Sequence, residues 1–232
     1  PVSILIQVAA RLHRFRDREA IVRLRALALD PRPGVRALAA AWLYDAGELK
    51  QAQVLATQLK NGIPYAEFQQ VARMLAANRR VDEAILDAVV DRLSDEKNTT
   101  RLLQQIAFLG QHRYAKARDA LRKLLLHANE RVSRAAFDVL ASLTGRLREE
   151  TIGPLLDGAD VDKRLWAAEA LRQRDNRRGL AVAADVLRTG TVPQRVSAAG
   201  LVASFVTDEA VEPLFDALED PHLDVRRAAL GG

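Results

Sequence analysis

Apolar residues recur along this chain with the spacing of an α-helix, and they do so in two alternating forms. In one form, large side chains stand three, four and seven positions apart, as in Ala20-Ile21-Leu24-Leu27 and Val211-Leu214-Leu218. In the other form, the segment is rich in alanine, as between Ala37 and Leu43. Such spacing puts the apolar residues on one face of a helix. The pattern therefore predicts antiparallel pairs, each with a small, alanine-rich first helix and a leucine-striped second helix.

These helix pairs repeat at a nearly constant step. The first helices can be anchored at residues 35, 67, 100, 132, 163, 194 and 225, which lie 31 to 33 residues apart. A step of this size is typical of a solenoid. We therefore expect an all-α, right-handed solenoid of about seven helical-hairpin repeats in a single domain. The repeats are expected at residues 1–30, 31–62, 63–97, 98–129, 130–160, 161–190 and 191–220, with a partial repeat at 221–232.

Both ends of the chain look unlike polar solenoid caps. The first segment is apolar on more than one face between Ile4 and Leu12, and the last helix, Val225 to Leu230, has no second helix after it. Solenoids normally close with a polar terminal repeat. We expect this chain to be a fragment of a longer protein, or its termini to dock on further repeats or other domains.

Composition narrows the classes of protein that remain. The chain has 232 residues, of which 49% are hydrophobic and 5% aromatic, and alanine and leucine dominate, which favours helices over sheets. It has no cysteine, so disulfides, thiolate nucleophiles, zinc–thiolate sites and iron–sulfur clusters are excluded. The apolar run at the start is too short to span a bilayer. The compartment stays unknown, with the cytoplasm slightly favoured.

Two motifs carry a resemblance to a known family. The segment 30–36, DPRPGVR, is matched by 220–226, DPHLDVR, and both fit the pattern Asp-Pro-x-x-x-Val-Arg. The second-helix segment Ala210-Val211-Glu212-Pro213-Leu214 fits Ala-Val-x-Pro-Leu. The chain thus resembles the HEAT-like repeats of phycobilisome bilin lyases over nearly its whole length. That resemblance implies a scaffold rather than an enzyme. Residues 63–97 fit it worst, with Glu67-Phe68 in place of Val-Arg, and a tetratricopeptide-like repeat is an alternative there.

One position of the repeat is rich in arginine. The residues assigned to it are Arg36, Arg101, Arg164, Arg195 and Arg226. One interpretation is a row of cations along a groove that meets phosphates. The favoured interpretation is a structural ladder, because recurring repeat positions generally serve stacking. The resemblance implies that this arginine, as in HEAT-like families, bonds carboxylates between repeats or carbonyls at helix ends.

No residue pattern indicates catalysis or a metal centre. The four histidines, His13, His112, His127 and His222, never pair at helical spacing, and neither a Gly-x-Ser-x-Gly turn nor a phosphate-binding glycine loop is present. Trp42 and Trp166 occupy nearly equivalent first-helix positions and are expected in the core, with stacking on a ligand as the alternative. We expect no enzyme activity and no cofactor.

Charge is uneven along the repeats and supplies the candidate binding site. The chain carries a net +5, residues 98–129 carry +5, and residues 191–220 carry −5. The basic centre is Arg113, Lys116, Arg118, Arg122 and Lys123. We expect Ala117, Ala120, Leu121 and Leu124 to face the core, which leaves the cations on exposed flanks. A solvated helical face is the plain alternative to a site.

The expected function follows from the repeats and the charge. We expect a non-catalytic scaffold that binds a partner protein through the concave surface of its second helices. The alternative is a nucleic-acid binder that contacts the phosphate backbone, which needs an uninterrupted basic track. The net −2 of residues 63–97 and of residues 130–160 interrupts that track. A HEAT-like DNA glycosylase or a bilin lyase is a weaker alternative, since it rests on the resemblance alone.

Overall fold

The computed structural model describes residues 18–78, 80–144, 149–172 and 177–231, and within these ranges the chain is all-α. Two compact units divide it, Pro1–Leu143 and Thr144–Gly232, called units 1 and 2 below. The helices that begin in unit 1 are α2 (Arg18–Leu27), α3 (Pro33–Asp45), α4 (Gln51–Asn61), α5 (Tyr65–Ala76), α6 (Glu83–Leu93), α7 (Thr99–Gln111), the 3₁₀ helix η1 (Ala115–Ala117), α8 (Arg118–Leu124) and α9 (Glu130–Thr144). Those of unit 2 are α10 (Glu149–Leu156), α11 (Val161–Leu171), α12 (Arg177–Thr189), α13 (Val192–Ala203), the 3₁₀ helix η3 (Asp208–Ala210), α14 (Val211–Leu218) and α15 (Leu223–Leu230).

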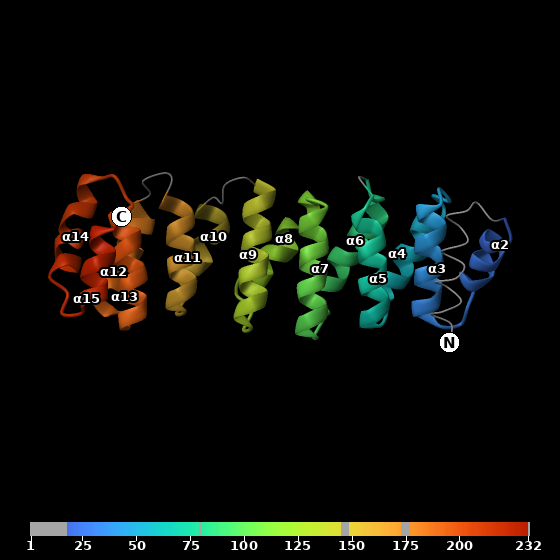
Figure 1. The fold of residues 1–232 in the computed structure, drawn as a ribbon, viewed down its shortest axis with the longest axis horizontal. Coiled ribbons are helices and arrows are strands. Elements are labelled where there is room, and N and C mark those ends of the chain that lie inside the picture. The colour runs from blue at the N-terminus through green and yellow to red at the C-terminus, as the bar shows by residue number, and fades with distance from the viewer. Residues whose placement is uncertain (1–17, 79, 145–148, 173–176, 232) are drawn as a thin grey trace. The chain divides into compact units, whose positions relative to one another are not determined.

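Unit 1 is built in two layers of helices. The first helices α3, α5, α7 and α9 lie side by side, and the second helices α4, α6 and α8 lie behind them (Figure 1). Helix α3 packs on α4 and α5, and α4 packs on α6. Fully buried side chains such as Leu55 of α4, Leu75 of α5 and Ile85 of α6 fill the space between the layers. The leucine stripes predicted from the sequence are thus the inner faces of these helices.

The first helices of unit 1 are not uniformly small on their packing faces. In α3, Ala37, Ala39, Ala40 and Ala41 are all fully buried, as the alanine-rich pattern predicted. In α5 and α7 the expectation is wrong, because their buried residues are large and include Phe68 and Phe108 but no alanine. Phe68 and Phe108 meet edge to face, with their ring centroids 6.2 Å apart. An aromatic contact of this kind fills a wider gap between helices than alanine can.

Unit 2 repeats the two-layer plan. Helix α13 packs on both α11 and α15, and α12 packs on α11 and α13. Its core again contains small side chains, with Ala167 and Ala168 of α11 and Ala198 and Ala199 of α13 fully buried. Most helices in both units pack against their neighbours in sequence, as in an array of helical repeats.

Polar caps fix where the first helices begin. The Asn98 side chain accepts hydrogen bonds from the backbone N–H groups of Thr100 and Arg101, both at 3.1 Å, and Asp160 accepts one from Lys163 at 3.2 Å. These bonds satisfy donors that a helix start leaves free. Asp30 and Asp220 lie two residues before the corresponding cap positions. Each instead accepts the backbone N–H two residues ahead, from Arg32 at 2.9 Å and from His222 at 2.8 Å. They therefore hold the turn between repeats rather than cap the helix itself.

Among the helices of the described ranges, none combines the length and apolar character needed to cross a membrane.

Candidate interaction surfaces

The five predicted cations are all exposed, but they lie in three different local structures. Arg113 is in the turn after α7, with a backbone φ of 49°, and its Nη2 donates to the Ser142 carbonyl at 3.2 Å. Lys116 is in η1, and Arg118, Arg122 and Lys123 are on α8. The structure therefore brings the last three together on one short helix and places Arg113 toward α9.

Acidic residues of α6 pair with two of the surrounding lysines, Lys60 and Lys116. Glu83, Asp87 and Asp91 stand four residues apart on this helix, and we call them the α6 acidic stripe. The Lys116 ammonium lies 2.5 Å from a Glu83 carboxylate oxygen. At the other end of the stripe, Lys60 of α4 lies 2.8 Å from Asp91. Sequence analysis missed this stripe, although its four-residue spacing was a usable signal. One of the five candidate cations, Lys116, is thereby already paired within the chain.

Contacts in this region shift the pKa values of Tyr114 and of the two lysines. Burial raises the pKa of Tyr114 to about 12, assisted by the hydrogen bond that its hydroxyl donates to Asp87 at 2.6 Å. The Glu83 carboxylate, followed by Tyr114, raises the pKa of Lys116, and Asp91 raises that of Lys60. Opposite charge favours the charged form of each lysine. These lysines are therefore cations at neutral pH that are held in specific pairs.

A groove of about 620 Å³ lies between the second helices α6 and α8. We call it the α6–α8 groove. It is lined by Lys60, Val90, Asp91, Leu93, Ser94, Glu96, Leu102, Ala120, Lys123, Leu124 and His127. Ala120 and Leu124 were expected in the core, and that expectation is wrong, because the gap between α6 and α8 leaves both half-buried on the groove wall. The lining combines apolar side chains with charges of both signs.

Two of the ladder arginines bond neutral backbone groups of the turn that precedes their helix. Arg36 Nη1 donates to the carbonyls of Asp30 and Pro31, both at 2.7 Å. Arg226 Nη1 donates to the carbonyls of Asp220 and Pro221, at 2.7 and 3.0 Å. These guanidinium groups hold the turn between helices, with their donors directed inward.

Two other ladder arginines bond carboxylates. Arg195 of α13 forms a two-point pair with Asp220, in the turn before α15, with N–O distances of 2.8 and 3.1 Å. Arg164 of α11 lies 2.7 Å from Asp185 of α12. The Arg195 guanidinium lowers the pKa of Asp220, and the same pair raises that of Arg195. Bidentate pairs of this kind fix geometry as well as charge.

Arg101 does not occupy the ladder position, so the prediction that it belongs to the ladder is wrong. It stands three residues after its cap Asn98, whereas Arg164 stands four residues after its cap Asp160. The residue four positions after Asn98 is Leu102, which is buried. The caps Asn98, Asp160, Thr191 and His222 fit a step of 31 residues, so α7 begins in register and Arg101 lies one position before the ladder, on the next face of the helix. Its Nε is buried without a hydrogen-bond partner.

The tryptophans and histidines are placed near helix ends and packing faces. Trp42 is half-buried and packs against a cluster that includes Leu24 and Leu43. Trp166 of α11 is also half-buried, beside the exposed Glu169. His112 ends α7, and burial lowers its pKa. Within the part of the chain described, no group of three or more histidine, aspartate or glutamate side chains is arranged to hold a metal ion. His13 lies outside the described residues.

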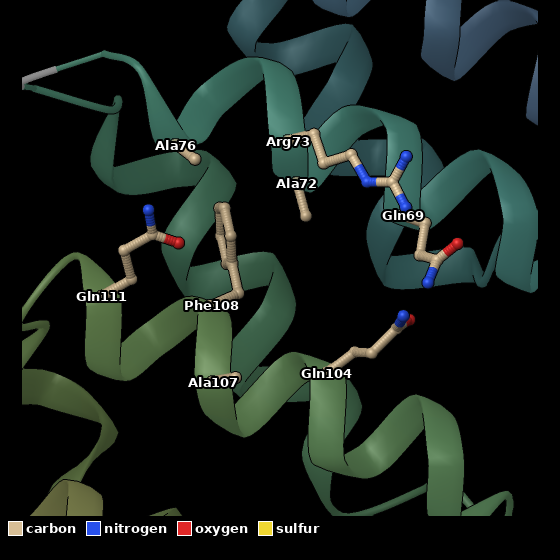
Figure 2. A pocket seen from close by; sticks show the side chains of 8 residues that line it. All are labelled: Gln69, Ala72, Arg73, Ala76, Gln104, Ala107, Phe108 and Gln111. Atoms are coloured by element: carbon tan, nitrogen blue, oxygen red, sulfur yellow. The ribbon is translucent and has the colours of Figure 1, made fainter.

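A second hollow, of about 230 Å³, lies between the first helices α5 and α7. We call it the α5–α7 pocket. Figure 2 shows Gln69 and Arg73 on α5 and Gln104, Phe108 and Gln111 on α7 around it. Its remaining lining residues are Ala72, Ala76 and Ala107. Sequence analysis gave no indication of this pocket.

Comparisons with known proteins give little beyond the fold. No protein-family profile matches the chain, and no curated protein matches it. Among solved structures, the chain is similar to an engineered protein determined by the Northeast Structural Genomics Consortium, with a TM-score of 0.40 and 18% sequence identity. The match covers 91% of this chain and 66% of that one, so this chain spans slightly less than two thirds of its length. The chain is an all-helical, repeat-like protein without a family assignment.

Proposed function

We propose that this chain is a right-handed α-solenoid of about seven HEAT-like helical pairs that acts as a non-catalytic scaffold for a partner protein. The sequence repeat and the two-layer arrangement within each unit support this architecture. The second helices form the binding surface. No cofactor takes part.

The lining of the α6–α8 groove is the observation that carries the proposal. Lys123 is exposed and makes no ion pair among the described residues, whereas the groove carboxylates Asp91 and Glu96 are paired with Lys60 and Arg92. Val90, Ala120 and Leu124 add apolar surface between these charges. Protein interfaces combine an apolar centre with a polar, charged rim in this way. A partner segment with an acidic residue for Lys123 and apolar side chains beside it fits this surface.

The groove is formed by helices that pack on a rigid core, which limits the entropy lost on binding. The unequal charge of the repeats, +5 for residues 98–129 and −5 for residues 191–220, orients the partner and raises its association rate.

Charge reversal in the groove tests the proposal. The chain is immobilised and used to capture proteins from cell extract, and each captured protein is then titrated against wild type, Lys123→Glu and the control Arg188→Glu. Arg188 is an exposed cation of α12 outside the groove. We expect Lys123→Glu to weaken binding about tenfold or more and Arg188→Glu to have little effect. Equal affinities for all three chains would contradict the proposal.

Nucleic-acid binding is the second candidate function. Its support is the sequence pI of about 9.9 and the exposed Arg118 and Lys123, neither of which makes an ion pair among the described residues. Against it, the α6 acidic stripe lies between the cations of α4 and those of η1 and α8. A labelled DNA duplex titrated at several salt concentrations separates the two functions. Tight binding with a steep salt dependence would establish phosphate contacts, and no binding at low salt would eliminate them.

A further inference from the structure

We propose that the α5–α7 pocket is a second binding site, which holds an extended, acidic segment of a protein chain by hydrogen bonds to its backbone. The pocket lies between the first helices α5 and α7, and the α6–α8 groove lies between the second helices α6 and α8. Figure 1 shows these two pairs of helices in separate layers. The two sites can therefore be tested separately, and this proposal does not depend on the function assigned to the groove.

Small side chains open the pocket. Ala72 and Ala76 of α5 face the gap from one side and Ala107 of α7 from the other. The floor is Phe108, which is buried and held against Phe68 at a centroid distance of 6.2 Å. The phenylalanine pair keeps the two helices apart at the floor of the pocket, while the alanines leave space between the helices at its opening. A chain without bulky side chains at this point fits between the helices.

Side-chain amides provide the polar contacts. Figure 2 shows Gln69 and Gln104 extending into the same gap from opposite helices, with Gln111 farther along α7. The Gln104 Oε1 atom is buried and has no hydrogen-bond partner. An unpaired buried acceptor is unfavourable, so a rotation of the Gln104 side chain that turns this oxygen toward a ligand donor in the gap is favoured. An amide side chain both donates and accepts, which matches the N–H and C=O groups of an extended backbone.

The spacing of the amides also suits an extended chain. Gln104 and Gln111 are seven residues apart on one helix, which corresponds to about 10.5 Å along its axis. Three residues of an extended chain cover about 10 Å. A tripeptide stretch therefore reaches from one glutamine to the other.

Charge selects an acidic segment. Arg73 is the one charged residue among those that line the pocket, and it is exposed. It makes no ion pair among the described residues, so its guanidinium is free to pair with a ligand carboxylate. Nucleic acid fits less well, because Phe108 is buried rather than presented for stacking and a single cation lines the pocket.

A random dodecapeptide library displayed on phage is the probe. Enriched peptides are synthesised with a fluorescent label and titrated by anisotropy against wild type, Gln104→Leu and Arg73→Gln. Gln53→Leu on α4 and Arg188→Gln on α12 are the matched controls, because both positions are exposed and lie outside the pocket. Circular dichroism checks that every variant is folded. Arg73→Gln keeps the test informative even if Gln104→Leu disturbs packing.

The proposal expects enriched peptides that contain aspartate or glutamate. Gln104→Leu and Arg73→Gln should each weaken binding about tenfold, and both controls should stay within twofold of wild type. Methylation of one peptide backbone nitrogen within the bound stretch should also weaken binding about tenfold. The proposal is wrong if no peptide is enriched, or if affinity is unchanged by both variants and by backbone methylation. It is equally wrong if a twelve-nucleotide single-stranded DNA binds in an Arg73-dependent way and no peptide does.

Discussion

At the scale of single residues, arginines at one position of the repeat make two different kinds of contact. Arg36 and Arg226 bond neutral carbonyls of the preceding turn, while Arg195 pairs with the carboxylate of Asp220. Both kinds of contact use the planar guanidinium group, which holds several N–H donors in a fixed arrangement that the lysine ammonium lacks. Arg36, Arg164, Arg195 and Arg226 each stand four residues after the cap of their helix, whereas Arg101 stands three residues after Asn98. That offset depends on where α7 begins, which the apolar spacing does not fix to a single residue.

Arg36→Lys should lower the free energy of unfolding by about 1–2 kcal/mol. The Arg36 fork bonds Asp30 and Pro31 through Nη1 and the Gln58 side chain through Nε and Nη2, and a single ammonium cannot reach all of them. Urea denaturation followed by circular dichroism measures the change. Arg23→Lys is the control, because its pair with Glu19 is exposed on both sides and should change stability by less than about 0.5 kcal/mol.

Asp220→Asn should reduce the sensitivity of unit 2 to acid. Arg195 lowers the pKa of Asp220 from 3.8, so the folded chain holds its proton more weakly than the unfolded chain does. The stabilisation is complete above the unfolded pKa near 4 and is lost as the pH falls through the folded value. We expect the variant to lose about 2–4 °C in Tm at pH 7 and progressively less toward pH 3. A Tm difference that stays constant over this range would contradict the account.

At the scale of elements, distances between helices are decided by a few small residues. A Cβ atom added to Gly110 of α7 would lie 2.7 Å from Val139 Cγ2 of α9, whereas one added to Gly200 of α13 would have no atom within 4 Å. The sequence alone shows only that both residues are glycine. Only the placement of the neighbouring helix distinguishes a required glycine from a replaceable one.

Gly110→Ala and Gly200→Ala should therefore change stability in opposite directions. Alanine is the better helix former by about 1 kcal/mol, so Gly200→Ala should stabilise by about 0.5–1 kcal/mol. At Gly110 the stiff, β-branched Val139 must move, and overpacking should outweigh that gain and leave a net loss of about 1 kcal/mol. Denaturant midpoints measure both changes. If Gly110→Ala stabilised the protein as much as Gly200→Ala does, α7 and α9 would not approach as described.

The α6 acidic stripe shows the same limit of sequence reasoning at this scale. The spacing of Glu83, Asp87 and Asp91 could be counted along the chain, but their partners Lys60 and Lys116 come from two other segments. To predict these ion pairs, one must know the order in which the second helices pack. From the sequence alone the basic cluster is a separate patch, whereas in the structure Lys116 is paired with Glu83.

At the scale of the whole molecule, the constant step was the strongest signal in the sequence. It predicted helix pairs because the anchors of the first helices and the apolar stripes of the second helices recur together. The structure places the caps Asn98, Asp160 and His222 on the same step. The two interaction surfaces could not be predicted in this way. Both depend on gaps between helices of successive pairs, α6 with α8 and α5 with α7, and the spacing of apolar residues along the chain does not specify such gaps.

The central claim is that the second helices present the surface to which a partner protein binds, and site-specific photo-crosslinking tests it most directly. A photoreactive amino acid is placed at Ser94, an exposed residue that lines the α6–α8 groove, or at Arg131, an exposed residue of the first helix α9. Each variant is irradiated with the partner obtained by capture. The account predicts a crosslink from Ser94 that Lys123→Glu removes, and no crosslink from Arg131. Crosslinking from Arg131 alone, or from Ser94 without dependence on Lys123, would contradict it.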